Sequence, residues 1–139
     1  MNIAFFLVPK QEVVCLTSTS TLRQALERME YHRYTAVPIL SEDGQYVGTL
    51  TEGDLLWFMK NNEGVTFDNA NRVPLSEIPM RINNVPVHIN ANMDDLISKA
   101  TTQNFVPVVD DMDRFIGIVR RSDIIEYCAG QIFKEKVVG

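Results

Sequence analysis

The stretch TAVPILSEDGQYVGTLTEGDLLWFM, residues 35–59, decides the fold because it occurs twice. It recurs as NFVPVVDDMDRFIGIVRRSDIIEYC, residues 104–128, at a constant offset of 69 residues and without a gap. Identical residues stand at Val37/Val106, Pro38/Pro107, Gly48/Gly117 and Asp54/Asp123. Elsewhere the chemical type is kept, as in Tyr46/Phe115. Two stretches with the same order of residue types predict two copies of one supersecondary unit.

A helix precedes each copy. Leu22, Ala25, Leu26 and Met29 recur at i, i+3, i+4 and i+7, the spacing of an amphipathic helix. Upstream of the repeated stretch the offset is 71 residues, so that Met93, Leu96 and Ile97 match Leu22, Ala25 and Leu26. Thr21 and Gln24 have the spacing of a capping box, and Asn92 with Asp95 takes the same places in the second copy.

Each copy therefore predicts the order β-α-β-β-α, and the fold class is α/β. The first copy has expected strands at Val13–Leu16, Thr35–Leu40 and Tyr46–Leu50 and a second helix from Asp54 to Lys60. In the second copy the first strand is Val85–Ile89 and the last helix Asp123–Ala129. A half of this size is marginal alone, so we expect the two repeats to pack together with pseudo-twofold symmetry.

The predicted division of the chain is repeat 1 over residues 1–62, a linker over 63–73 and repeat 2 over 74–139. The stretch Asn61–Val73 is polar and rich in asparagine, which is typical of a connecting segment. Pro74–Ile78 has the composition of a short helical turn leading into the second repeat.

Composition excludes several classes of protein. The net charge of −5 argues against nucleic-acid binding, which needs clustered Lys and Arg. No apolar run reaches the roughly 20 residues that span a membrane, and Ile3–Val8 lacks the features of a signal peptide. Cys15 and Cys128 are expected to be buried thiols in a reducing cytosol, which predicts a cytoplasmic protein.

No motif for catalysis or for a metal is recognisable. His32 and His88 have no Cys, His or carboxylate at metal-ligand spacing, and no Walker A, Rossmann or nucleophile-elbow pattern occurs. The prediction is a protein that is not an enzyme and holds no cofactor or metal.

The duplicated pattern resembles the CBS domain. Its elements are Pro followed by apolar residues, an acidic turn, an aromatic–hydrophobic–Gly triplet and an Asp that opens a helix. Two such domains form a Bateman module, and the chain is similar to small stand-alone CBS proteins of Gram-positive bacteria, some of which bind cyclic di-AMP. The resemblance implies a sensor that binds AMP, ADP, ATP or cyclic di-AMP in the cleft between the repeats. It further implies a homodimer and an unidentified protein partner.

In that family the ligand motif is Gly-h-h-Thr-x-x-Asp, where h is hydrophobic, and Gly48–Asp54 has it in full. The resemblance assigns ribose hydroxyls to Asp54, and ribose or phosphate to Thr51. A Thr-x-x-Asp sequence at a helix start is also close to a capping box, so a purely structural role is the alternative.

The second copy departs from the motif, because Arg120 stands where the threonine is expected. Asp123 is kept, and Arg120 with Arg121 could make bidentate contacts to phosphate. The alternative is that both arginines lie on a solvated face. The resemblance places the adenine beside Thr35 and Ala36 in the first copy and beside Phe105 in the second.

A second function remains open from the sequence alone. The chain could be a structural or protein-interaction module without a ligand, which the loss of the threonine at Arg120 favours. Trp57, early in the second helix, could then contribute to an interface, or it could belong to the core.

Overall fold

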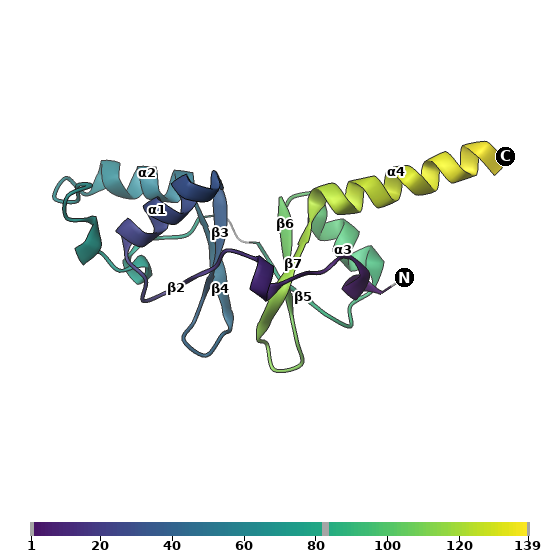
Figure 1. Cartoon of the computed structure of the whole chain (residues 1–139), viewed down its shortest axis with the longest axis horizontal. Helices are drawn as coiled ribbons and strands as arrows, with labels where there is room; N and C mark the ends of the chain where they lie inside the picture. The colour runs from purple at the N-terminus through teal and green to yellow at the C-terminus, as the bar shows by residue number, and fades with distance from the viewer. Residues whose placement is uncertain (1, 82–83, 139) are drawn as a thin grey trace. The chain divides into compact units, whose positions relative to one another are not determined.

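The computed structural model describes residues 2–81 and 84–138, apart from the side chains of residues 135–138. The chain forms two compact units. We call Val14–Asn84 the repeat 1 unit, and Met1–Val13 together with Val85–Gly139 the repeat 2 unit. In each unit two helices accompany a sheet (Figure 1).

In the repeat 1 unit the strand order is β2-β3-β4, with β2 parallel to β3 and β3 antiparallel to β4. Its elements are β2 (Leu16–Thr17), α1 (Leu22–His32), β3 (Ala36–Leu40), β4 (Tyr46–Thr51), α2 (Glu52–Asn61), and the 3-10 helices η3 (Ala70–Arg72) and η4 (Leu75–Glu77). Leu22 and Ala25 of α1 share a fully buried core with Val37 and Leu50 of the sheet.

In the repeat 2 unit the strand order is β1-β7-β6-β5. Its elements are η1 (Ile3–Phe6), β1 (Val8–Pro9), η2 (Lys10–Glu12), β5 (Val87–His88), α3 (Met93–Ala100), β6 (Phe105–Val109), β7 (Phe115–Arg120) and α4 (Arg121–Val138). Leu96 of α3 packs against Val106, Val108 and Val119 of the sheet.

The predicted order β-α-β-β-α is confirmed in both units, and so are the caps of their first helices. Thr21 and Gln24 form both bonds of a capping box, and the Asn92 side chain accepts a hydrogen bond from the Asp95 N–H. The first strands are shorter than predicted, because only Leu16–Thr17 and Val87–His88 pair with a neighbouring strand. The helix predicted at Asp123–Ala129 is longer and runs over Arg121–Val138.

The division of the chain differs from the predicted ranges at the N-terminus. The first 13 residues belong to the repeat 2 unit, where Val8 and Pro9 pair antiparallel with Ile118 and Gly117. Ile3 is fully buried in the core of that unit. The segment leading into repeat 1 is therefore an edge strand of the repeat 2 sheet.

The segment after α2 completes the repeat 1 unit in the corresponding way. Ala70 and Val73, inside the predicted linker, are buried in the repeat 1 core, and the Leu22 N–H donates to the Val73 carbonyl over 2.8 Å. Met80 lies against Gly48, the position that corresponds to Gly117. Residues 63–73 are thus part of the repeat 1 unit, because their apolar side chains fill its core.

Gly117 permits the close approach of β1 to β7. Its φ is +157°, and a Cβ atom built there would lie 2.2 Å from the Val8 carbonyl oxygen. Since that oxygen belongs to backbone, it cannot move aside without displacing the strand. At Gly48 the corresponding Cβ would meet only the flexible end of Met80, at 2.9 Å.

We predict that Gly117→Ala lowers the free energy of unfolding by about 1–3 kcal/mol, as overpacking against fixed atoms does. Gly48→Ala is the matched control, and its effect should be clearly smaller because a methionine side chain can move. Urea denaturation followed by circular dichroism measures both. Equal stability of Gly117→Ala and the unchanged protein would contradict the pairing of β1 with β7.

Candidate functional site

The junction between β4 and α2 holds the two motif residues of repeat 1. Thr51 is the N-cap of α2, and its hydroxyl accepts a hydrogen bond from the Asp54 N–H over 3.1 Å. In return the Asp54 Oδ2 atom accepts the Thr51 N–H over 3.0 Å. Both bonds of a capping box are present, which confirms the structural role that the spacing allowed.

The second carboxylate oxygen of Asp54 is also engaged. Its Oδ1 atom accepts the backbone N–H of Arg81 over 3.1 Å, and the residue is only 3% exposed. Asp54 therefore joins the start of α2 to the segment that covers the unit. A ribose hydroxyl could reach this carboxylate only by taking the place of one of these N–H groups, so its ligand role stays a prediction.

Thr35 and Ala36 lie beside this junction, at the start of β3. Ala36 pairs with Thr51 in the sheet, and the Glu52 N–H donates to the Thr35 carbonyl over 3.0 Å. Thr35 is exposed and Ala36 half-buried. The structure thus brings together the four residues that the sequence analysis selected in repeat 1.

The corresponding junction of repeat 2 is built by β7 and α4. Phe105 pairs with Arg120, and the Arg121 N–H donates to the Asn104 carbonyl over 3.0 Å. Arg120 takes the place of the threonine as the partner of Asp123. Its Nε donates to Asp123 Oδ2 over 2.9 Å and its Nη2 to Oδ1 over 3.3 Å, a bidentate ion pair.

The remaining two candidates of repeat 2 have structural contacts. Arg121 donates from Nε to the carbonyls of Ala100 and Gln103, over 2.8 and 2.9 Å, and so satisfies acceptors at the end of α3. Phe105 is buried in its strand. Their predicted contacts with phosphate and adenine stay predictions.

A cavity lies next to each junction, and the two differ in size. The repeat 2 cavity has a volume of about 480 Å³ and is lined by Phe5, Phe6, Leu7, Val8, Arg120, Asp123, Glu126 and Tyr127. The repeat 1 cavity measures about 120 Å³ and is lined by Asp54, Trp57, Phe58, Asn61, Asn62, Pro79 and Arg81. Pockets that hold small molecules measure about 300–1,000 Å³, which the larger of these two satisfies.

The sequence analysis missed the aromatic residues of the N-terminal segment. The rings of Phe6 and Tyr127 meet edge to face with centroids 5.3 Å apart, and Phe5 meets Phe6 in the same way at 5.4 Å. The available signal was the apolar run Ile3–Val8, which composition alone cannot assign to the second repeat.

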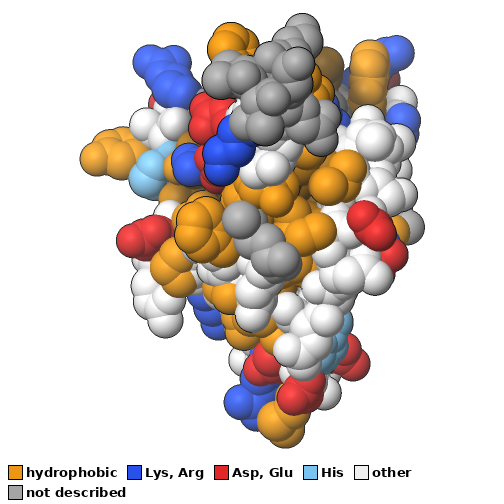
Figure 2. All heavy atoms as spheres, turned by 90° about the vertical axis from the view of Figure 1, so that its right-hand side faces the viewer, with side chains coloured by type: hydrophobic (Ala, Val, Ile, Leu, Met, Phe, Trp, Pro, Cys, Tyr) orange, Lys and Arg blue, Asp and Glu red, His pale blue; other side chains and the backbone are white. Residues whose placement is uncertain are grey.

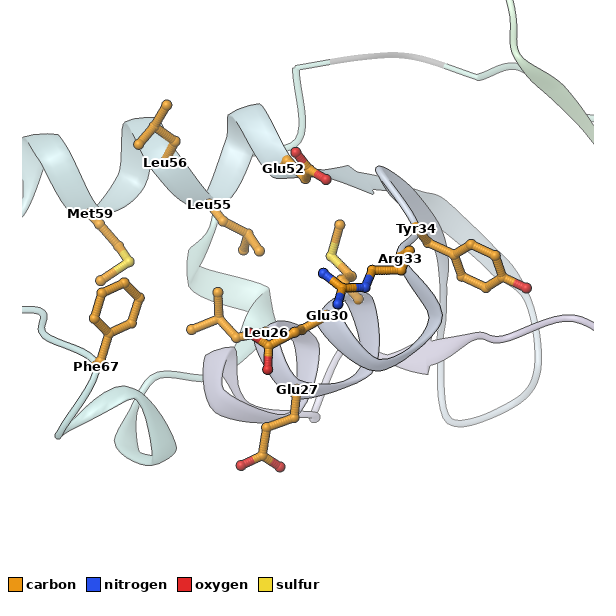
Figure 3. A pocket seen from close by; sticks show the side chains of 11 residues that line it. Leu26, Glu27, Glu30, Arg33, Tyr34, Glu52, Leu55, Leu56, Met59 and Phe67 are labelled. Atoms are coloured by element: carbon orange, nitrogen blue, oxygen red, sulfur yellow. The ribbon is translucent and has the colours of Figure 1, made fainter.

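Two further grooves lie between the helices of each unit. The groove between α1 and α2, about 520 Å³, is shown in Figure 3, where Leu26 and Leu55 point toward one another. The groove between α3 and α4, about 460 Å³, is lined mostly by isoleucine and alanine and includes Cys128. Leu56 is 60% exposed beside the first groove and Ile125, the corresponding residue, 58% exposed beside the second.

Two shifted pKa values lie away from the junctions. Burial raises the pKa of Tyr46 at the start of β4, and its hydrogen bond with Thr49 partly opposes this. The backbone N–H groups of Arg114 and Met112 lower the pKa of the exposed Asp110 carboxyl, in the turn after β6. These shifts therefore belong to the sheet hairpins.

Features of other site classes were also sought among residues 2–81 and 84–138. Within those ranges no group of three or more His, Cys, Asp or Glu side chains could hold a metal ion. Nor, within them, does any helix have the length and apolar character needed to cross a membrane. Cys15 and Cys128, expected to be buried, are half-buried. The cytoplasmic location stays a prediction.

Among characterised sequences, an uncharacterized protein of Methanocaldococcus jannaschii is 26% identical to the chain over 140 residues. The match covers 92% of this chain and 50% of that protein. The chain thus spans about half the length of the curated relatives it matches.

Solved structures share the fold over nearly the whole chain. CbpB in complex with c-di-AMP (cyclic di-AMP) superposes with a TM-score of 0.85 at 18% identity, covering 100% of this chain and 91% of that one. CBSX2 in complex with AMP gives a TM-score of 0.72 at 22% identity, covering 94% and 97%.

The CBS domain model matches residues 7–61 and 75–130, one match for each copy of the repeat. These matches cover most of the chain and coincide with the two strand-to-helix junctions described above. The predicted resemblance is confirmed, and the chain belongs to the CBS-domain family, of which it carries two domains.

Proposed function

We propose that the chain is a non-catalytic regulatory module that binds an adenine nucleotide at its strand-to-helix junctions and signals to a partner protein. The observation that carries this proposal is the repeat 2 junction, where Arg120, Asp123 and an aromatic-lined cavity of about 480 Å³ meet. A guanidinium suits a phosphate, a carboxylate suits ribose hydroxyls, and aromatic rings suit a purine. AMP, ADP, ATP and cyclic di-AMP all carry these three groups.

Two proteins of the same fold support the choice of adenine. CbpB was crystallised with c-di-AMP and CBSX2 with AMP, and adenine is common to both ligands. In repeat 1, Thr51, Asp54, Thr35 and Ala36 are the residues at the corresponding junction. Binding would reach a partner only through two states of the module that differ in affinity for the ligand.

The helix faces support a homodimer as the form in which the module acts. Leu56 and Ile125 occupy the same position of the repeat, and more than half of each side chain is exposed beside an apolar groove. Phe67 and Ile132 extend the exposed apolar surface of the two grooves. A second copy of the chain would cover both faces.

We predict that an adenine nucleotide raises the melting temperature of the protein. At a ligand concentration 100 times Kd the stabilisation is about 2.7 kcal/mol, which corresponds to a rise of roughly 5–15 °C for a chain of this size. A thermal-shift screen against AMP, ADP, ATP and cyclic di-AMP, with GMP and cyclic di-GMP as controls, measures it. A flat response to every adenine ligand would reject the sensor and favour the ligand-free interaction module.

We also predict that Leu56→Glu and Ile125→Glu each raise the dissociation constant of the dimer by about tenfold or more, because each buries an unpaired carboxylate. Analytical ultracentrifugation over a concentration series measures this constant. Val47→Glu, which alters a residue 49% exposed on β4, is the control and should leave the dimer unchanged. A monomeric unchanged protein, or dimers insensitive to both helix variants, would reject this interface.

A further inference from the structure

The two junction cavities are the same site of the repeat in two different states. Asp54, Trp57 and Phe58 line the smaller cavity, and their equivalents at an offset of 69, Asp123, Glu126 and Tyr127, line the larger. The covering segment is residues 79–81 in the first and residues 5–8 in the second. Differences between the cavities therefore report what the sequence changed at one structural position.

The repeat 1 cavity is closed by hydrogen bonds of the protein itself. Both oxygens of Asp54 accept backbone N–H groups, one from Thr51 and one from Arg81. The carboxylate thereby holds the covering segment against the start of α2, and a volume of about 120 Å³ is left beside it. This is too small for a nucleotide, so opening it would break bonds that a buried carboxylate needs.

The repeat 2 cavity is open because the threonine has become Arg120. The carboxylate of Asp123 faces the Arg120 guanidinium, and side-chain exposure is 59% for Arg120 and 25% for Asp123. An exposed ion pair of this kind adds little to stability, so a phosphate can replace the carboxylate as the partner of Arg120. Asp123 is then available to a ribose hydroxyl.

The N-terminal segment supplies an aromatic wall to this cavity. Phe6 packs edge to face with Tyr127, Phe5 packs on Phe6, and Phe5 is 75% exposed. The equivalent cavity in repeat 1 is covered by Pro79 and Arg81 instead. The face of the molecule that includes the repeat 2 unit carries hydrophobic side chains across its middle (Figure 2).

We propose that the chain binds one nucleotide, in the repeat 2 cavity, with the base against the Phe5–Phe6–Tyr127 wall, the phosphate on Arg120 and a ribose hydroxyl on Asp123. The repeat 1 junction is structural. This inference rests on the proposed nucleotide binding and adds the stoichiometry, the choice of repeat and a role for the N-terminal segment.

Isothermal titration calorimetry of the full chain, with cyclic di-AMP and with AMP as probes, tests the inference. We expect one nucleotide bound per chain. Phe6→Ala should weaken binding by about tenfold, as the loss of one stacking ring does, and Asp123→Asn by about tenfold or more. Trp57→Ala, at the position equivalent to Glu126 in the repeat 1 cavity, and Phe67→Ala, an exposed aromatic 69% accessible, should stay within about twofold of the unchanged protein.

The outcomes separate this inference from the proposed function. Two nucleotides per chain would overturn it while leaving nucleotide binding intact. Loss of binding in Trp57→Ala with retention in Asp123→Asn would move the site to repeat 1, and full affinity of Phe6→Ala would remove the aromatic wall. Circular dichroism melts of each variant show whether a loss of binding reflects a loss of fold. Absence of heat with both probes, together with a flat thermal-shift screen, would reject the proposed function itself.

Discussion

The contact between the Val8 carbonyl and the Cα of Gly117 is the constraint on which the repeat 2 unit depends. A side chain at residue 117 would meet that carbonyl, so glycine is the residue that lets the N-terminal segment lie along β7. Once β1 is held there, Ile3 enters the core and Phe5 and Phe6 line the cavity beside Arg120. The edge of a sheet, a core residue and the candidate binding site thus follow from one close backbone approach.

The duplicated junctions show how one substitution redirects a conserved side-chain position of the repeat. Asp54 and Asp123 both stand in the first turn of a helix, but their partners differ. Thr51 is short and holds Asp54 inward in a capping box, whereas Arg120 is long and draws Asp123 into an ion pair at the cavity. The carboxylate that closes one junction is therefore exposed to ligand in the other.

The sequence was sufficient for what depends on local order along the chain. The duplication predicted the β-α-β-β-α units, and residue spacing predicted the caps at Thr21, Thr51 and Asn92, because these bonds join neighbours three residues apart. It did not predict that residues 1–13 complete the repeat 2 unit, since β1 and β7 are more than a hundred residues apart. The same limit hid Phe5 and Phe6 from the candidate site, and the carbonyls that Arg121 satisfies at the end of α3.

The candidate site and the candidate interface share one helix, which gives a physical route between them. Asp123 lies in the first turn of α4, and the exposed Ile125 lies two residues further along the same helix. A nucleotide that exchanges the partner of Arg120 acts on the start of α4, and any resulting shift of that helix moves the apolar groove that it forms with α3. The coupling must be reciprocal: whatever covers the groove changes the affinity for nucleotide by the same factor by which nucleotide changes the affinity for it. In repeat 1 the equivalent helix is tied at its start by three hydrogen bonds to Asp54 and Thr51, so the groove beside Leu56 is the fixed face of the pair.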